Sequence, residues 1–555
     1  MVPDVTCGDR LLSAVAATIG PLTLLGKKPL IFLTILLNFL SFSTSRDTLT
    51  TTQSLSDGET LISDDGTFAL GFFTPSYSNN NNRYVGIWYL NIPVDTVIWV
   101  ANRRHPINGT AGKLFITNNG TLGITDGNSS IIWSSTLTLE VTNPIARLLD
   151  TGNFVVTSGD DLNNFSWQSF DYPTDTFVPG MKLGRSWTSG LNCNLTAWSS
   201  PTDPSPGNFT FAMDLHGDPQ MILWEGSKRI IRSGPWTGLA FSGLLPYNPS
   251  YTTTFAFHFV NNKEETYYTM NVIDSSTLTR MVMNQSGILQ QFVLLDSGQW
   301  GLYWHSPSTQ CDSYLACGPY GAVCDTDGSP MCSCLQGFLP KKPADWALRD
   351  WSSGCIRKTK LDCRNGTDGF VTVKQALLPD TVSATVDMTK SLDECRSECL
   401  RNCSCTAFAS ADTRGGGNGC IIWSTEISDI LVYSNGGQDF YMRLGAADMG
   451  SISQNSGHPI LAVVLSVILG TVLLLVSAIY FIWRRRKQFR GTTSISEERI
   501  AENTEQDEME LPLFDLVAIE AATSNFSDRN KLGEGGFGPV YMVKICNCFL
   551  SLTLS

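Results

Sequence analysis

The hexapeptide DGTFAL at residues 65–70 recurs with substitutions as NGTLGI at residues 119–124 and as TGNFVV at residues 151–156. Each copy places a turn glycine before a short run of strand-forming residues. Tryptophan-containing segments, VGIWY, VIWVANR and IIWSS, lie between the copies. A repeated turn-and-strand unit cannot bury its apolar face alone, so the pattern predicts a three-fold arrangement of sheets around a shared aromatic core.

The composition indicates several folded domains and excludes one class of partner. The chain has 555 residues, of which 42% are apolar and 16% are charged, and this balance is typical of folded modules rather than of disorder. The net charge is −13, and basic residues are concentrated only at residues 484–487. We therefore expect no nucleic-acid partner.

Cysteines and glycosylation sequons place most of the chain in the secretory pathway. Of sixteen cysteines, twelve lie between Cys311 and Cys420, and this clustering predicts an oxidising compartment. Nine sequons precede residue 450, which favours glycosylation outside the cell. The asparagines are Asn108, Asn119, Asn128, Asn164, Asn194, Asn208, Asn284, Asn365 and Asn402.

Two apolar segments predict the membrane topology. The sequence predicts an N-terminal extension and a signal peptide within residues 1–45, with cleavage near Arg46. Residues 1–26 have no assigned role. Residues 460–483 carry no charge and are long enough to cross a bilayer. The sequence RRRK follows directly, so the positive-inside rule places the C-terminus in the cytoplasm. We expect a single-pass type I protein of the plasma membrane with its N-terminus extracellular.

Residues 46–190 resemble the bulb-type mannose-binding lectins, whose β-prism repeats carry the sugar motif Q-x-D-x-N-x-V-x-Y. Asn153 and Val155 align with the Asn and Val of the motif. Leu149 and Thr151 then replace its Gln and Asp, while Asp150 lies one position out of register. The resemblance implies a degenerate sugar site at Asp150, Asn153 and Val155, kept either for mannose or as a scaffold that binds protein.

Residues 191–310 resemble the S-locus glycoprotein region of plant S-domain receptors. The resemblance rests on SWQSFDYPTDTFVPG just upstream, SSPTDPSPGNF, SGPWTGLAFSG and YWHSPSTQCDSYLACGPYG. Faint further repeats, HGDPQMIL and SGILQQFVLL, suggest a second prism. Cys193 has no evident partner, so it is either a free thiol or an intermolecular link.

Residues 311–355 contain six cysteines, which permit fifteen pairings that spacing alone does not resolve. The C-x-C pair and the glycines around it resemble an EGF-like module. No acidic cluster precedes the first cysteine, so we predict no bound calcium. The pairs that the resemblance implies are Cys311–Cys324, Cys317–Cys332 and Cys334–Cys355.

Residues 356–445 contain SLDECRSECLRNCSCTAF, in which Ser391 and Glu394 form a capping box at the start of a predicted helix. A zinc site is the alternative for four cysteines so closely spaced, but thiols in an oxidising compartment pair with one another. The string, with GCIIWSTEISDI and GQDFYMRL, resembles a PAN/apple module. By that resemblance the pairs are Cys395–Cys420 and Cys399–Cys405, which leaves Cys363 with Cys403.

The C-terminal part reads as a linker at residues 484–530 and the truncated start of a protein kinase domain at residues 531–555. Gly533, Gly535, Gly538 and Val540 match the glycine-rich loop that covers ATP phosphates. Lys544 is too early for the lysine of the third strand, and no catalytic loop or metal-binding aspartate follows. We therefore expect a largely disordered piece with no kinase activity and no cofactor, although ATP and magnesium serve the full-length family.

Taken along its length, the chain resembles plant G-type lectin S-receptor-like serine/threonine kinases. The resemblance implies a mainly β ectodomain of β-prism lectin domains, disulfide-rich EGF-like and PAN/apple modules, one transmembrane helix and an incomplete kinase N-lobe. The leading hypothesis is a receptor for a peptide or glycan in self-recognition, such as recognition of pollen, or in defence. It would pair with full-length S-domain receptors, as a homo- or heterodimer, and act as a decoy or co-receptor. The alternatives are an incomplete record of an active kinase and a mannose-binding lectin.

Overall fold

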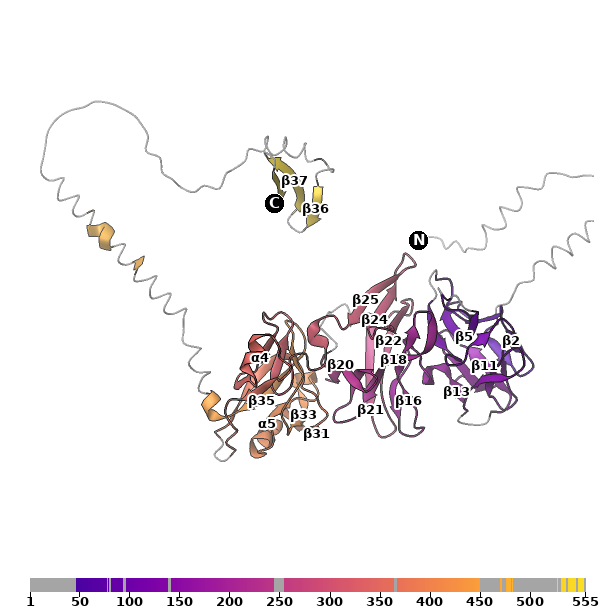
Figure 1. Cartoon of the computed structure of the whole chain (residues 1–555), viewed down its shortest axis with the longest axis horizontal. Helices are drawn as coiled ribbons and strands as arrows, with labels where there is room; N and C mark the ends of the chain where they lie inside the picture. Colours follow the sequence, from indigo (N-terminus) through magenta and orange to yellow (C-terminus); the bar gives the residue numbers. More distant parts are fainter. Residues whose placement is uncertain are drawn as a thin grey trace, which may run out of the picture. The chain divides into compact units, whose positions relative to one another are not determined.

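The computed structural model describes residues 46–76, 78, 81–92, 96–137, 141–243, 254–363, 367–449, 470–471, 476–480, 482, 527, 531–535, 538–545 and 548–553. The predicted signal peptide at residues 1–45 lies outside the described residues, as does the linker at residues 484–530 apart from Ser527. The described chain is mainly β, as the sequence predicts (Figure 1).

The first β-prism consists of three antiparallel sheets. One sheet holds β1 (Thr48–Thr50), β11 (Pro144–Leu148), β12 (Phe154–Ser158) and β13 (Trp167–Gln168). The second holds β2 (Ser54–Ser56), β8 (Lys113–Ile116), β9 (Leu122–Thr125) and β10 (Ile131–Ser134). The third holds β3 (Thr60–Ile62), β4 (Phe68–Phe73), β5 (Asn82–Tyr89) and β6 (Val97–Val100), with β7 (Ile107–Asn108) paired to β5.

The three sequence repeats supply one strand to each of these sheets, namely β4, β9 and β12. Their glycines Gly66, Gly120 and Gly152 have φ values of 75°, 92° and 79°, in the left-handed region that glycine adopts at little cost. Each glycine N–H donates to the carbonyl oxygen three residues earlier, at 2.9 Å in all three turns. The repeat therefore encodes the same turn three times, which confirms the predicted three-fold architecture.

One tryptophan from each sheet meets at the end of the first prism. Trp99, Trp133 and Trp167 contact one another edge to face, with ring centroids 5.9–6.3 Å apart. Such aromatic pairs add to the stability that burial alone provides. The sequence predicts Trp88 as a member of the core, but its ring lies beside Phe73 instead, at 6.4 Å.

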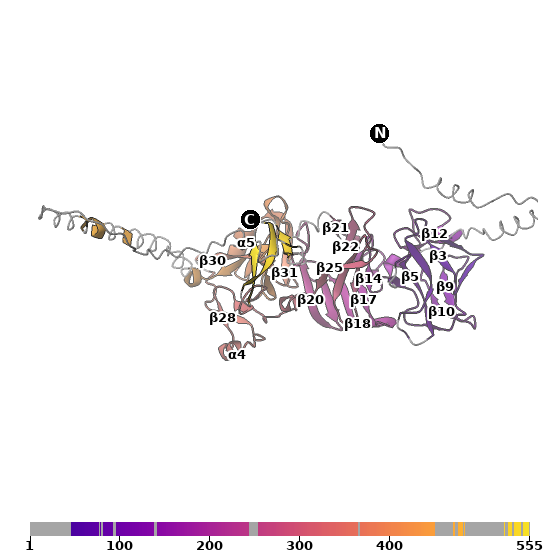
Figure 2. The ribbon, with the colours of Figure 1, turned by 90° about the horizontal axis from the view of Figure 1, so that it is seen from above.

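A second β-prism follows, again built from three four-stranded antiparallel sheets. One sheet holds β14 (Thr176–Phe177), β23 (Thr279–Met283), β24 (Leu289–Leu294) and β25 (Trp300–Ser306). Another holds β15 (Leu183–Ser186), β16 (Asn192–Cys193), β21 (Phe255–Asn261) and β22 (Glu265–Val272). The last holds β17 (Leu195–Ser200), β18 (Asp203–Asp214), β19 (Gln220–Glu225) and β20 (Lys228–Pro235) (Figure 2).

The two prisms share a continuous apolar core and several polar contacts. The Tyr89 hydroxyl donates to the carbonyl oxygen of Thr279 at 3.0 Å, and its ring meets Trp300 edge to face at 5.1 Å. Arg103 donates from its guanidinium to the carbonyl oxygens of Pro204, at 2.7 Å, and Thr196, at 3.1 Å. Because these groups are largely buried, the contacts fix the relative orientation of the two prisms.

The two cysteine-rich segments share one eight-stranded sheet. Its order is β27 (Cys332–Cys334), β26 (Ala322–Asp325), β34 (Ile430–Val432), β30 (Gly369–Leu377), β35 (Gln438–Leu444), β32 (Ala407–Ala409), β33 (Asn418–Trp423) and β31 (Ala384–Ser391). A separate pair joins β28 (Phe338–Pro340) to β29 (Cys355–Arg357). Within the described part of this body lie the helices α4 (Pro343–Ala347) and α5 (Leu392–Arg401) and the 3-10 turns Gln310–Asp312 and Arg414–Gly416. Since β26 pairs in parallel with β34, the EGF-like and PAN segments form one body.

Asp380 joins the second prism to that body. Its carboxylate accepts hydrogen bonds from Gln220 at 3.0 Å, from Arg229 at 2.7 Å and from the Tyr314 hydroxyl at 2.7 Å. Burial by itself would raise the pKa of Asp380, but Arg232 and the Tyr314 hydroxyl hold it below its ordinary value. A charged carboxylate with this many donors fixes both sides of the junction.

The C-terminal unit contains a three-stranded antiparallel sheet of β36 (Lys531–Gly535), β37 (Gly538–Ile545) and β38 (Cys548–Thr553). This differs from the predicted disorder, because the last residues of the chain supply a third strand and three strands are more stable than a lone hairpin. Of the predicted span at residues 460–483, only residues 470–471, 476–480 and 482 are described. Among the described residues, none of the helices has the length and apolar character to cross a membrane.

Candidate functional site

The residues of the predicted sugar motif lie on β12 and the turn before it. Asn153 is buried, and its side-chain oxygen accepts from the Ser169 hydroxyl at 3.1 Å and from the Phe170 N–H at 3.2 Å. Its side-chain nitrogen donates to Gln168 at 2.8 Å. Both lone pairs of the amide oxygen are thus occupied inside the protein. Asn153 acts as a bridge between β12 and the Ser169–Asp171 turn.

The other two motif residues do not complete a sugar site. Val155 is fully buried in the core. Asp150 is exposed, and its carboxylate accepts the N–H of Asp65 at 2.9 Å. Burial raises the pKa of Asp150 and the nearby charge of Asp65 raises it further, although the hydrogen bond from the Asp65 N–H partly offsets these effects. The structure therefore does not bring Asp150 and Asn153 together around one ligand.

A groove between the two prisms has the size and chemistry of a recognition site. Its volume is about 720 Å³, within the range of ligand-binding clefts. The aromatic rings of Trp133, Trp167 and Tyr172 line it, and Arg104 and His105 add exposed polar groups. This groove could not be predicted from the sequence, because residues of both prisms form its walls.

Tyr172 is the exposed aromatic residue of this groove. The residue is 39% exposed, its ring stacks on Trp167 at 5.9 Å, and its carbonyl oxygen accepts the indole N–H of Trp99 at 2.9 Å. Partial burial raises the pKa of the Tyr172 hydroxyl, and the carboxylate of Asp171 raises it further. Tyr172 therefore offers a neutral hydroxyl beside a flat apolar surface.

Cys193 is a buried free thiol in the wall of a neighbouring hollow. Its sulfur donates to the carbonyl oxygen of Asp171 at 3.3 Å. Burial raises the pKa of this thiol to about 12, so it stays protonated. Of the two readings of Cys193, the structure supports a free thiol, because a buried and protonated sulfur is poorly placed for an intermolecular bond.

Five of the six predicted cysteine pairs are disulfide bonds in the structure. They join Cys311 to Cys324, Cys317 to Cys332, Cys334 to Cys355, Cys395 to Cys420 and Cys399 to Cys405. Most of these sulfurs are buried in the core of the cysteine-rich body. Each such bridge typically contributes about 2–4 kcal/mol to the stability of a small module.

The sixth predicted pair, Cys363–Cys403, is not a disulfide bond in the structure, so this prediction is wrong. Cys363 and Cys403 are free thiols of the described chain. The Cys363 sulfur lies 3.5 Å from the carbonyl oxygen of Cys403, and the Cys403 sulfur lies 3.9 Å from the carbonyl oxygen of Cys363. The Cys403 thiol also interacts directly with the Cys363 thiol and raises its pKa, so the two sulfurs are neighbours that are not bonded.

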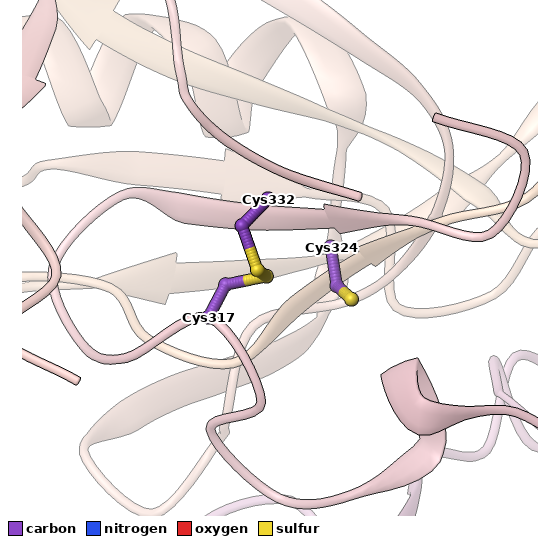
Figure 3. A group of neighbouring side chains, drawn as sticks. All are labelled: Cys317, Cys324 and Cys332. Carbon is purple, nitrogen blue, oxygen red and sulfur yellow. A yellow bond between two sulfur atoms is a disulfide. The ribbon is translucent and has the colours of Figure 1, made fainter. Parts of the chain in front are cut away.

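Three cysteines gather closely enough to suggest a metal site. Figure 3 shows Cys317, Cys324 and Cys332, whose sulfurs lie within 4.8 Å of one another. Metal binding at cysteine requires a thiolate. Because all three sulfurs belong to disulfides, the cluster offers no such ligand.

The structure describes eight of the nine sequon asparagines. Six are exposed, namely Asn108, Asn119, Asn128, Asn164, Asn208 and Asn402. Asn194, which lines the groove between the prisms, and Asn284 are half-buried. Asn365 lies outside the described residues. The six exposed positions are sterically open to a glycan.

The glycine-rich loop forms a hairpin. Gly533 pairs with Val540 and Gly535 with Gly538 across β36 and β37. The turn residues 536–537 lie outside the described part of the chain.

A half-buried carboxyl group near the prism–PAN junction, that of Asp218, is expected to make the stability depend on pH. The carbonyl oxygen of Asp218 accepts the Thr381 hydroxyl at 3.0 Å. Burial raises the pKa of the Asp218 carboxyl to about 7. The folded protein keeps this proton up to about pH 7, whereas the unfolded chain loses it near pH 4. Its stabilising effect is therefore full below about pH 4 and is lost as pH rises to about 7.

We expect Asp218→Asn to flatten this dependence. Thermal unfolding of the secreted ectodomain would be followed from about pH 4 to about pH 8. Over this range the difference in the free energy of unfolding between wild type and variant would change by at most about 4 kcal/mol. The exposed Asp296→Asn serves as the control. Parallel curves for wild type and Asp218→Asn would contradict the assignment.

These features define a class of protein in which two lectin-type β-prisms are joined to a cysteine-rich body that contains disulfide bonds. The same order appears in matches to known families. Residues 96–199 match the D-mannose binding lectin family, residues 231–342 the S-locus glycoprotein domain and residues 363–430 the PAN-like domain.

Several relatives whose family is known match most of the chain in sequence. It is 40% identical to the Arabidopsis thaliana receptor-like serine/threonine-protein kinase SD1-8, with 93% of this chain and 62% of that relative covered. It is also 40% identical to the putative inactive G-type lectin S-receptor-like serine/threonine-protein kinase SRK of A. thaliana, with 91% and 95% covered. Identity to the S-locus-specific glycoprotein S6 of Brassica oleracea is 41%, with 76% and 96% covered. The chain belongs to the family of G-type lectin S-receptor-like serine/threonine kinases.

Solved lectin structures also match part of the chain. A monomeric mannose-binding lectin from Gastrodia elata aligns at 20% identity and a TM-score of 0.18, covering 22% of this chain and 94% of the lectin. The mannose-specific agglutinin of snowdrop aligns at 21% identity and a TM-score of 0.16, covering 21% and 94%.

Proposed function

We propose that this protein is a single-pass type I receptor of the plasma membrane, which holds residues 46–449 outside the cell and binds an extracellular peptide or glycan. The groove between the prisms is the observation that carries this proposal. Its aromatic floor suits the flat faces of sugars or aromatic side chains, and its polar rim supplies hydrogen bonds. The disulfides and exposed sequons support an oxidising, glycosylating compartment.

We propose that the ligand binds in the groove rather than at the degenerate sugar motif. Asn153 is engaged by three internal partners. A sugar hydroxyl would have to displace those hydrogen bonds, and the loss would offset the gain. A mannose-binding role is therefore less well supported than a receptor role.

We further propose that the chain signals through pairing with full-length family members in self-recognition or defence, without transferring phosphate itself. Two relatives support this, because the chain spans nearly their whole length and one is named a putative inactive kinase, the other an S-locus-specific glycoprotein. The chain spans 62% of SD1-8, whose name includes the kinase activity. Surface exposure, glycosylation and pairing in intact cells test the proposal.

A further inference from the structure

One glycosylation sequon lies on the wall of the groove between the prisms. Asn194 stands between β16 and β17, and Thr196, the last residue of its sequon, lies on β17. Both residues line the groove, whose volume is about 720 Å³. Among the described sequon asparagines, Asn194 alone lines it. A glycan at this position would therefore start inside the groove.

The alternation of side chains along β17 turns Asn194 away from the core of the second prism. Leu195 and Ala197 are fully buried in that core. Successive side chains of an extended chain point to opposite faces, so Asn194 and Thr196 share the face that borders the groove. Thr196 pairs with Thr210 of β18, which also lines the groove. The sequon thus presents its asparagine to the open space.

The Asn194 side chain is free to carry a sugar. Its nitrogen and oxygen keep accessible surface, and among the described residues neither atom has a hydrogen-bond partner. The other half-buried sequon asparagine differs, because the side-chain nitrogen of Asn284 donates to Gln290 at 3.3 Å. A glycan is joined to the asparagine side-chain nitrogen, so at Asn194 it displaces no hydrogen bond of the folded protein.

The groove offers the surfaces that the first sugars of an N-linked glycan can use. These sugars are N-acetylglucosamine residues, which combine an apolar face with hydroxyl and acetamido groups. Tyr172 supplies an exposed ring, and Trp133 lines the same groove half-buried. The exposed side chains of Ser134, Thr136 and Arg104 form no hydrogen bond with another described residue. They are therefore available to the polar groups of a sugar.

We propose that the N-linked glycan of Asn194 folds back into the groove and packs its first two sugars against Tyr172 and Trp133. Stacking on an aromatic ring buries the apolar face of a sugar, and buried apolar area is stabilising. The glycan is attached within the groove, so its sugars are present there at a high effective concentration. Weak contacts are sufficient to keep a tethered ligand in place.

Such a glycan would regulate the groove, and this consequence rests on the receptor function proposed above. An extracellular ligand that enters the groove would have to displace the two sugars or bind against them. The position of the glycan itself does not depend on any other ligand, so it can be measured without one.

The test compares glycans at different sites of the same folded protein. The full chain is purified from plant cells in which N-glycans are kept in their high-mannose form. An endoglycosidase that cuts between the first two sugars is added, and mass spectrometry follows release at Asn194 and at the exposed Asn128 and Asn208. Cleavage requires the sugars to leave the groove, so we expect release at Asn194 to be at least about tenfold slower. In peptides cut from the protein, all three sites should be cleaved equally.

Tyr172→Ala removes the exposed ring, and we expect it to speed release at Asn194 about fivefold without changing release at Asn208. Tyr303→Ala is the matched control, since Tyr303 is 37% exposed and does not line the groove. The comparison of sites in the wild type stands whether or not the Tyr172 variant folds.

Three results would each overturn the proposal. They are an Asn194 without glycan in the purified protein, equal release at Asn194 and Asn208 in the folded chain, and slow release that a folded Tyr172→Ala variant retains. The last result would show that the half-buried position of Asn194, and not stacking in the groove, protects its glycan.

Discussion

Replacement of Arg443 by methionine is expected to unfold the PAN segment well below the melting temperature of the wild type. The Arg443 side chain is 2% exposed and that of Asp368 is 1% exposed, with 3.0 Å between the Arg443 Nη2 and the Asp368 Oδ2. Methionine fills much of the same volume but leaves the Asp368 charge buried and unpaired. Removing one partner of a buried ion pair costs about 3–5 kcal/mol.

Arg443 also caps the C-terminus of helix α5. Its Nη1 donates to the carbonyl oxygens of Cys399 and Asn402, both at 2.8 Å, at the C-terminus of α5. Helix C-terminal carbonyls lack partners within the helix and attract positive charge. Arg401→Met removes an exposed charge from the same turn and is the matched control. Similar denaturation midpoints for the two variants in urea would contradict this role.

The second large effect is expected at Arg232, which joins the second prism to the PAN segment. Its side chain is 1% exposed, forms an ion pair with Asp429 and donates to the carbonyl oxygen of Leu378 at 2.6 Å. Arg232→Met would leave the Asp429 carboxylate largely buried without its cation. We expect a loss of about 3–5 kcal/mol, visible in calorimetry as separate unfolding of the prisms and the cysteine-rich body.

Two further variants keep this second prediction falsifiable. Lys228→Met changes an exposed residue at the start of β20 and should leave a single transition. Asp429→Asn removes the charge while tolerating the left-handed backbone of this residue, whose φ is 60°. The double variant, Arg232→Met with Asp429→Asn, should lose less stability than the sum of the two single losses. The reason is that it no longer contains an unpaired buried carboxylate. Additive losses would show that the pair is not coupled.

The repeats of the first prism could be predicted because the residue preferences of turns and the alternation of apolar and polar residues along a strand are local features. A glycine in a left-handed turn followed by a strand has the same sequence pattern wherever it occurs. Trp167 was missed as the third core tryptophan, since it lies on the two-residue strand β13 and its partners come from other sheets.

A small cavity between the prisms, which Trp198 helps to line, could not be predicted. It depends on a bulge of β18 opposite Trp198 and on the approach of Arg280 and Phe73, which are far apart in the chain. The single sheet shared by the EGF-like and PAN segments was missed for the same reason, because β26 and β34 pair only after the chain has folded. Sequence patterns report local structure, whereas these features arise from tertiary contacts.

The central claim is that residues 46–449 form a glycosylated receptor ectodomain on the cell surface. The direct measurement is made in intact plant cells that express the 555-residue chain with one epitope after residue 46 and another at its end, together with full-length SD1-8 carrying a third tag. Membrane-impermeant biotin, glycosidase treatment and co-precipitation are read from the same cells.

The account predicts that the first epitope is labelled from outside, that the epitope at the end of the chain is labelled only after permeabilisation and that glycosidase lowers the apparent mass. It also predicts that the chain precipitates with SD1-8 and that labelled phosphate enters SD1-8 alone. An unglycosylated protein in the soluble fraction, with neither epitope reached from outside, would contradict the account.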